Sequence, residues 1–420
     1  MMAGIYDFYA EQVVFLTGAT GGLGGCLLYK LAVVLEVQRI YVLIRGSARR
    51  AVQRWKHIMP DQFEQLEDRR RTGQIVLVVG DVTEKRFGIN RDVLQEMMRC
   101  VTSIIHSAAN ISFRAPLSKV VMDNCLPALE LADMTTEFSK LRHFVQVSSA
   151  FANSFLPDGL VEEKLYYFSN PDDAEGELKE ILRTGMTRYL QGFPWDYAYS
   201  KQLMERLLMA RFPNLPLLLL RPTSIGPAIA QPYEMYGPQG SCPVSTLYSR
   251  LMRPTGGKSI WHTPTNEMDG NNVLDEIPVD LVANILLQHV FVGTRGVVHA
   301  SASCYIPKTL KWTLGQPSKY VPVEWAAKMA TPVFIDDYTV EQCKEAQFYQ
   351  IGSRHWEFEA IASNNLESLQ GPLTFGMDNH NIEHFTERRI GMIFQNFMAK
   401  EILVKQGVEV SQQSRTLEKL

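Results

Sequence analysis

The stretch VVFLTGATGGLG, residues 13–24, is the strongest indication of the fold, because it joins a short apolar run to a turn with three regularly spaced glycines. Gly18 permits a tight turn, Gly21 lets the backbone approach an anion, and Gly24 lets the next helix pack on the sheet. The helix expected over Gly21–Val34 presents free N–H groups and a positive dipole end at its start. The stretch therefore predicts the first strand, turn and helix of a sheet that binds a dinucleotide by its pyrophosphate.

The first two thirds of the chain continue this pattern, with short apolar runs alternating with helical segments. Such alternation is typical of a parallel sheet with helices on both faces. The fold class is therefore α/β, a Rossmann-type doubly wound parallel sheet with a small helical C-terminal domain. The expected strands are Val13–Leu16, Ile40–Ile44, Ile75–Val79, Val101–His106, Phe144–Val147 and Leu217–Leu220.

The sequence also indicates how the chain divides. We expect the Rossmann domain over residues 11–330, with two insertions at about 153–195 and 226–272 that cover the site. The pattern changes to helices near Thr331, which predicts a helical C-terminal domain over 331–410. The polar residues 411–420 are expected to form a frayed tail.

Composition narrows the class of partner. The 420 residues carry 42 Lys and Arg against 45 Asp and Glu, a net charge of −3, which gives no electrostatic case for binding nucleic acid. The six cysteines are scattered and form no CxxC pair, so we expect free thiols in a reducing compartment and no metal site. No apolar run is long enough to cross a bilayer, which leaves only peripheral membrane association open.

The end of the second expected strand indicates which nicotinamide cofactor binds. Enzymes that use NAD place an acid there, whereas those that use NADP place a cation. Here Arg45 directly follows the strand, Ser47 lies two residues further on, and no acidic residue is close in the sequence. Arg45 is suited to a bidentate contact with a 2′-phosphate, so we expect NADPH. Asp81 closes the third strand, where it either contacts the adenine or simply forms a turn.

The catalytic chemistry is indicated by Tyr197 and Lys201, a Y-x-x-x-K on an expected helix that places both on one face. A phenol with a pKa of about 10 is too weak an acid to act unaided near neutral pH, and a neighbouring ammonium favours its phenolate. Ser148 and Ser149 end the fifth strand, where a hydroxyl can donate to a carbonyl oxygen. Together with the glycine turn, these groups predict a reductase.

At this point the chain resembles the fatty acyl-CoA reductase, or "male sterility", family of the extended short-chain dehydrogenase/reductase superfamily. The resemblance spans most of residues 13–300, and the stretch Trp356–Phe397 resembles the family's small helical C-terminal domain. It is carried by Thr17–Gly24, Gly80-Asp81, His106–Ala109 with Phe113, Asn124, Val147–Phe151, Glu162-Glu163, Tyr197–Lys201, Arg221-Pro222, Gly237–Gly240, Ile277–Asp280 and Asn284.

The resemblance implies reduction of a long-chain fatty acyl-CoA by NADPH to a bound aldehyde and then to a fatty alcohol, with CoA released. It makes Tyr197 the proton donor and Lys201 its electrostatic partner, and it puts Ser149 in place of the family's usual threonine, beside Ser148. Lys201 is also expected to hold the nicotinamide ribose. The other expected cofactor contacts are Thr17, Gly18, Thr20, Gly21, Gly22, Leu23, Gly24, Arg45, Ser47, Asp81, Val82, Ser107, Ala108, Ala109, Asn124, Pro222, Thr223 and Ile225.

Three departures from the family pattern bear on the substrate. Gly22 stands where the family has a bulky aromatic residue, Phe151 replaces a tyrosine, and residues 231–236 lack the usual Pro-Gly-Trp pattern. An apolar channel between the insertions and the C-terminal helices is expected, because a fatty chain gains about 0.8 kcal/mol per buried methylene.

Other functions fit the same residues. A thioester reductase that stops at the aldehyde, or an extended short-chain dehydrogenase acting on a ketone or sugar, would use the same groups. A sensor or scaffold that binds NADPH without turnover is the alternative outside enzymes. We expect an intracellular protein, either cytoplasmic or peripherally associated with the endoplasmic reticulum or peroxisome, and the sequence leaves its oligomeric state open.

Overall fold

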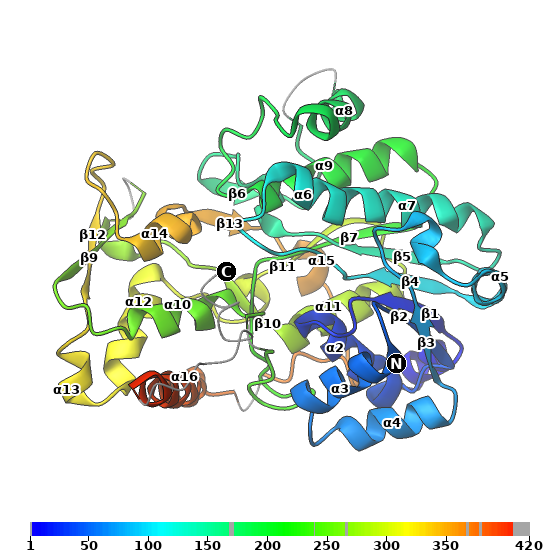
Figure 1. Ribbon diagram of the computed structural model, residues 1–420, viewed down its shortest axis with the longest axis horizontal. Coiled ribbons are helices and arrows are strands. Elements are labelled where there is room, and N and C mark those ends of the chain that lie inside the picture. The colour runs from blue at the N-terminus through cyan, green and yellow to red at the C-terminus, as the bar shows by residue number, and fades with distance from the viewer. Residues whose placement is uncertain are drawn as a thin grey trace.

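A computed structural model describes residues 2–167, 172–238, 240–264, 268–366, 369–377 and 380–405. Its centre is a seven-stranded sheet in which every neighbouring pair is parallel (Figure 1). The strand order is β11-β7-β5-β4-β1-β2-β3. The strands are β1 (Val13–Thr17), β2 (Arg39–Ile44), β3 (Ile75–Val79), β4 (Ser103–His106), β5 (His143–Val147), β7 (Leu217–Pro222) and β11 (Gly296–Ala300).

Helices cover both faces of this sheet, as expected of a doubly wound fold. One buried core lies between the sheet and α1 (Met2–Ala10), α2 (Gly22–Tyr29), α3 (Ala48–Ile58), α4 (Phe63–Arg71) and α11 (Val279–Val292). A second lies on the other face, under α5 (Arg91–Cys100), α6 (Leu117–Val120), α7 (Leu126–Met134) and α9 (Asp196–Arg211). In Figure 1, α2, α3 and α4 lie below the sheet, whereas α6, α7 and α9 lie above it.

The six expected strands are all present, and the α/β class is confirmed. A seventh strand, β11, was missed, although its sequence GVVHA carries two β-branched residues. It pairs with β7 at the edge of the sheet. The helix expected over Gly21–Val34 changes character within its length, because α2 passes into a π-helical turn at Lys30–Val34.

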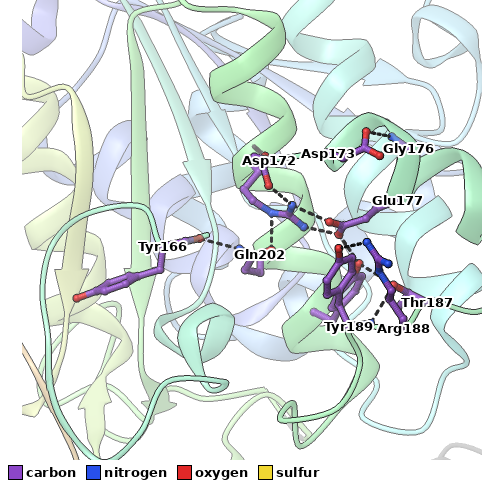
Figure 2. Close-up of polar contacts among 11 residues, drawn as sticks. Tyr166, Asp172, Asp173, Gly176, Glu177, Thr187, Arg188, Tyr189 and Gln202 are labelled. Carbon is purple, nitrogen blue, oxygen red and sulfur yellow. Dashed lines mark hydrogen bonds and ion pairs between the residues drawn. The ribbon is translucent and has the colours of Figure 1, made fainter. Parts of the chain in front are cut away.

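The first insertion lies mostly away from the sheet's carboxyl edge. Its helix α8 (Ala174–Thr184) packs on α9 through Ala174, Leu178 and Ile181. The carboxylates of Asp172 and Glu177, which converge in Figure 2, accept hydrogen bonds from the Arg206 guanidinium of α9 at 2.6 and 2.5 Å. The ion pair between Arg206 and Glu177 is buried on both sides and fixes α8 to α9. Among the described residues of 153–195, Trp195 is the one that lines the cavity described below, and the covering role expected of this insertion remains a prediction.

The region expected to be a helical C-terminal domain contains helices and also two strands. The helices are α14 (Lys344–Phe348), α15 (Ile361–Asn364) and α16 (Ile382–Lys405). Strand β12 (Thr331–Ile335) pairs with β9 (Lys258–His262), and β13 (Trp356–Phe358) pairs with β6 (Gly159–Val161). Both sheets cross the boundary predicted at residue 330, which remains a prediction, and the expected tail 411–420 lies outside the described residues.

The remaining elements surround the sheet's carboxyl edge. A two-stranded parallel sheet joins β8 (Ser224–Gly226) to β10 (Glu276–Pro278). Nearby lie α10 (Pro243–Leu251), α12 (Leu310–Tyr320) and α13 (Val323–Ala326), which group with α16 at one end of the molecule in Figure 1. Among the described helices, none combines the length and apolar character required to cross a membrane.

Candidate active site

A cavity of about 250 Å³ opens at the carboxyl edge of the parallel sheet. Ligands of doubly wound folds bind at this edge, where loops from successive strands meet. The cavity is lined by the glycine turn after β1, by the ends of β4, β5 and β7, by the second insertion and by residues 348–351. It therefore joins the expected phosphate-binding turn to the expected catalytic residues.

The glycine turn has the geometry that its spacing predicts. Gly18 has a φ of +78°, and a Cβ there would lie 2.7 Å from the Ala108 nitrogen. A Cβ on Gly24 would lie 2.2 Å from the Gly18 carbonyl oxygen, so the helix packs against the turn only because this side chain is absent. The N-cap of α2, Gly21, provides no side-chain cap, which leaves the first N–H groups of the helix to a ligand. The turn fits a pyrophosphate.

Thr17 connects the turn to β4 rather than lining the cavity. Its hydroxyl accepts a hydrogen bond from the Ala108 N–H at 3.1 Å and lies 2.8 Å from His106 Nδ1. Ser107 Oγ donates to the Thr17 carbonyl at 2.7 Å. Burial lowers the pKa of His106 to about 3, so this imidazole is neutral. Thr17 therefore fixes the spacing between the two strands that flank the cavity.

The structure explains why position 22 carries glycine instead of the bulky aromatic residue of the family pattern. A Cβ on Gly22 would lie 3.1 Å from the Ser241 side chain, and the Tyr236 hydroxyl donates to the Gly22 carbonyl at 3.1 Å. A Cβ on Gly25 would lie 2.3 Å from the same hydroxyl. The second insertion thus packs onto the first turn of α2 and occupies the space that a bulky residue 22 would need.

The corner expected to hold the 2′-phosphate is exposed. Arg45 and Ser47 lie beyond the carboxyl end of β2, and Ser47 caps α3 by accepting from the Arg50 N–H at 3.3 Å. Asp81 forms a turn by accepting from the Thr83 N–H and hydroxyl. The first of these bonds is the largest cause that lowers the pKa of Asp81, and the charge of Arg45 contributes less. Arg45 and Asp81 therefore lie within electrostatic reach of each other.

Tyr197 and Lys201 lie on one face of α9, as predicted. The Lys201 ammonium is buried, donates to the Val147 carbonyl at 2.9 Å and lies 5.9 Å from the centre of the Tyr197 ring. Burial lowers the pKa of Lys201 to about 8. Burial also raises the pKa of Tyr197, and hydrogen bonding with Ser149 lowers it by less, so the phenol keeps its proton at neutral pH.

The two serines that end β5 differ in their partners. Ser149 Oγ accepts from the Phe151 N–H at 3.2 Å, which caps a short 3₁₀ turn. Ser148 Oγ is buried and has no hydrogen-bond partner within the described part of the chain. Both line the cavity with Tyr197. A buried hydroxyl without a partner is costly, and a carbonyl oxygen bound in the cavity would satisfy it.

Asn124 makes its hydrogen bonds within the protein. Its Oδ1 accepts from the Asn110 N–H at 2.7 Å, and its Nδ2 donates to the Asn110 carbonyl at 3.0 Å and to Ser200 Oγ at 3.2 Å. It does not line the cavity. Asn124 thus connects the loop after β4 to the helix that carries Tyr197 and Lys201.

An aromatic wall lies beside the expected catalytic residues, and the sequence analysis missed most of it. Phe113 stacks on Trp195 with ring centres 4.0 Å apart, and its centre lies 6.1 Å from that of Tyr197 and 5.7 Å from that of Phe348. Trp195 could have been recognised because it precedes Tyr197 by two residues. Phe348 comes from α14, which only the tertiary fold brings to the cavity.

The cavity gathers most of the expected site residues. It is lined by Gly18, Gly21, Gly22, Leu23, Gly24, Ser107, Ala109, Ser148, Ser149, Tyr197, Lys201, Pro222, Thr223 and Ile225. The expected contacts that do not line it are Thr17, Thr20, Arg45, Ser47, Asp81, Val82, Ala108 and Asn124. Among the described residues, no three His, Cys, Asp or Glu side chains are grouped to hold a metal ion.

Sequence comparison places this geometry among known proteins. The male sterility protein family matches residues 16–286. The chain is 29% identical to the fatty acyl-CoA reductase wat of Drosophila melanogaster, over 67% of this chain and 54% of that protein. It is 28% identical to fatty acyl-CoA reductase 2 of Mus musculus, over 73% of this chain and 59% of that protein. The chain thus spans little more than half the length of these curated relatives.

Solved structures support the fold. The terminal R domain from the myxalamid PKS-NRPS biosynthetic pathway has a TM-score of 0.64 at 17% identity, covering 92% of this chain and 91% of that one. A yeast methylglyoxal/isovaleraldehyde reductase in complex with NADPH has a TM-score of 0.57 at 13% identity, covering 94% of this chain and 100% of that one. Identities this low establish only a shared architecture.

Proposed function

The chain belongs to the male sterility protein family, and from this premise we propose that it reduces long-chain fatty acyl-CoA to fatty alcohol with NADPH. The observation that carries the proposal is the single cavity that joins the glycine turn to Ser148, Ser149, Tyr197 and Lys201. Its aromatic far wall is suited to an apolar acyl chain. The relatives named above as fatty acyl-CoA reductases support the choice of substrate.

The residues present fit a nicotinamide dinucleotide phosphate. The glycine turn and the start of α2 would hold the pyrophosphate, Lys201 the nicotinamide ribose, and Arg45 the 2′-phosphate. Bound there, NADPH would supply the hydride that reduces a carbonyl carbon.

The side chains of the cavity would carry the polar part of the reaction. The thioester carbonyl would accept hydrogen bonds from Ser148 and Ser149, which stabilise the developing oxyanion. Tyr197 would donate its proton to that oxygen, and the Lys201 ammonium would stabilise the resulting phenolate. Collapse of the resulting hemithioacetal would break its C–S bond and pass the hydroxyl proton to sulfur, so that CoA leaves as the thiol and an aldehyde remains in the cavity. Once Tyr197 has regained a proton and a second NADPH has bound, the same groups would protonate the aldehyde oxygen in the reduction to the alcohol.

Arg45 provides a test of cofactor choice. Replacing Arg45 with Asp removes a charge-assisted pair with the 2′-phosphate, a contact of about 1.5–3 kcal/mol. We expect the ratio of kcat/KM for NADPH to that for NADH to fall by about ten- to a hundred-fold. The matched control is Arg183→Asp, an exposed change on α8, which should leave the ratio unchanged. An unaltered ratio in the Arg45 variant would place the phosphate elsewhere.

The pH dependence of kcat/KM should reflect the ionisation of Lys201. Its ammonium is charged below a pKa of about 8 and neutral above it, and only the charged form stabilises the Tyr197 phenolate. We therefore expect kcat/KM to fall as the pH rises through about 8. Lys201→Arg keeps the charge and should move that fall to higher pH in the activity that remains. A fall at the same pH in both proteins would assign it to another group.

Product identification tests the proposed function directly. Incubation with palmitoyl-CoA and NADPH, followed by gas chromatography, should yield hexadecanol and free CoA, with two equivalents of NADPH consumed per alcohol. A panel of acyl-CoAs of different length would then define the substrate range. Aldehyde that accumulates without alcohol would contradict the alcohol-forming proposal, and turnover of ketones or sugars but of no thioester would contradict it entirely.

We also propose an intracellular location, either in the cytoplasm or at the surface of the endoplasmic reticulum or peroxisome. All six cysteines are free thiols, which supports a reducing compartment. Fractionation of cells that express a tagged protein would test this, because a secreted or lumenal product would contradict it.

A further inference from the structure

Two arginines lie over the same ring at the aromatic wall. Phe348, at the end of α14, lines the cavity. The guanidinium carbon of Arg114, in the loop after β4, lies 5.6 Å from the centre of the Phe348 ring, and that of Arg250, in α10, lies 5.1 Å from it. Arg114 is exposed and Arg250 is half-buried, so both cations lie where the wall meets solvent.

The ring contacts set an upper limit on the distance between these cations and Tyr197. The ring centres of Tyr197 and Phe113 are 6.1 Å apart, and those of Phe113 and Phe348 are 5.7 Å apart. Continuing to the guanidinium groups, this path places both cations at most about 17 Å from the Tyr197 ring. The pantetheine arm that joins a thioester sulfur to the first phosphate of CoA spans about 15 Å at the extension of a peptide chain.

We propose that Arg114 and Arg250 form the binding site for the phosphates of the CoA moiety, with the Phe348 ring holding the two guanidinium groups in place. The inference rests on the proposed function, since it assumes an acyl-CoA substrate with its thioester carbon beside Tyr197. The acyl chain would occupy the aromatic wall, and the pantetheine arm would leave the cavity past Phe348.

The chemistry of the two side chains supports this site. A guanidinium binds phosphate through parallel N–H donors, with more geometric specificity than an ammonium. A cation over a ring is attracted to its face, so the Phe348 ring helps to fix the position of both guanidinium groups. The alternative is that the two arginines have a structural role beside Phe348 and do not bind the substrate.

A kinetic experiment separates these two roles. The double variant Arg114→Ala/Arg250→Ala would be assayed with an acyl-CoA and with the N-acetylcysteamine thioester of the same acid, which has no phosphates. We expect KM for the acyl-CoA to rise by about ten- to a hundred-fold, with kcat and the KM of the truncated thioester unchanged. An equal loss on both substrates, or on neither, would overturn the proposal.

A matched control lies in the first insertion, among residues that do not line the cavity. Arg188 is also exposed and also lies over a ring, with its guanidinium carbon 4.7 Å from the centre of Tyr189 (Figure 2). Arg188→Ala removes the same charge and the same kind of ring contact away from the cavity. It should leave KM for both thioesters unchanged.

A binding measurement makes the site testable without turnover. Titration calorimetry with desulfo-CoA, at saturating NADP⁺ so that the adenine nucleotide cannot enter the cofactor groove, should detect binding to the unaltered protein. We expect the double variant to lose at least ten-fold in affinity. Unchanged affinity would overturn the site while leaving the proposed reduction intact. Lost affinity in a protein that reduces no thioester would instead support the site and contradict the proposed function.

Discussion

Replacing Tyr197 with phenylalanine should lower kcat by about 10²- to 10⁴-fold while leaving NADPH binding intact. The change removes one hydroxyl, which would be the proton donor to the carbonyl oxygen, and general acid catalysis contributes a factor of this size. The ring stays, so its contact with Phe113 and the shape of the cavity are retained. Steady-state kinetics with palmitoyl-CoA and a fluorescence titration with NADPH would measure the two effects.

The same helix offers the control. Tyr199 lies two residues further on, and its hydroxyl donates to Glu177 Oε2 at 2.6 Å, away from the cavity. Tyr199→Phe should keep kcat near that of the unaltered protein and instead reduce stability by about 1–3 kcal/mol, because a buried carboxylate loses a donor. Turnover that survives in the Tyr197 variant, or fails equally in both, would remove Tyr197 from the proposed role.

The largest effect on stability should come from Glu276. Its carboxylate in β10 accepts from Arg389 of α16 at 2.7 and 2.8 Å and from Lys308 at 3.1 Å, and all three side chains are buried. Glu276→Gln removes the carboxylate that contacts both of these cations. Breaking a buried pair of this kind costs about 3–5 kcal/mol, which urea unfolding would measure as a lower midpoint.

An exposed ion pair of α16 serves as the comparison for the buried contacts of Glu276. Glu383 contacts Lys319, and the two side chains are 48% and 52% exposed. Glu383→Gln should cost less than about 1 kcal/mol, because solvent already screens the pair. Equal losses in the two variants would mean that burial does not decide the strength of these contacts.

The dependence of stability on acid pH should also reflect Glu276. Burial alone would raise the pKa of Glu276, but Arg389 and Lys308 outweigh it and lower the pKa to about 2. Its stabilising contribution is therefore complete above the ordinary value of 4.5 and is lost as the pH falls towards 2. The Gln variant should lack this part of the acid sensitivity.

The sequence predicted those features that depend on local pattern. Each of these features depends on a short segment: the glycine turn, the six strands and the Y-x-x-x-K spacing. The parallel sheet then brings the carboxyl ends of the strands to one edge, because its strands all run in the same direction. Thr17 and Asn124 were predicted as cofactor contacts, and neither lines the cavity. Their partners in the protein, Ala108 and Ser200, are set by strand register and helix packing. The sequence alone therefore could not predict these hydrogen bonds.

The substrate end of the cavity was harder to predict for a physical reason. Strand β12 is only partly buried and has no partner near it in sequence, so its period carries little signal. Phe348 reaches the cavity because α14 packs beside α10, and Arg389 finds Glu276 only once α16 has docked. These contacts join the last third of the chain to the second insertion and to the strand β10 that follows it, and no local motif encodes them.

Strand β6 pairs with β13, and β9 pairs with β12, so both small sheets join segments that are far apart in the sequence. This pairing affects the order in which the protein folds during synthesis. The turn after β1 and the strands beside it leave the ribosome first and can pair among themselves. The partners of β6 and β9 emerge much later, and contacts between distant segments form slowly. The glycine turn and the strands beside it can therefore pair before the aromatic side of the cavity has formed. The edges of β9 and β6 stay unpaired until translation has passed their partners, which end at Ile335 and Phe358.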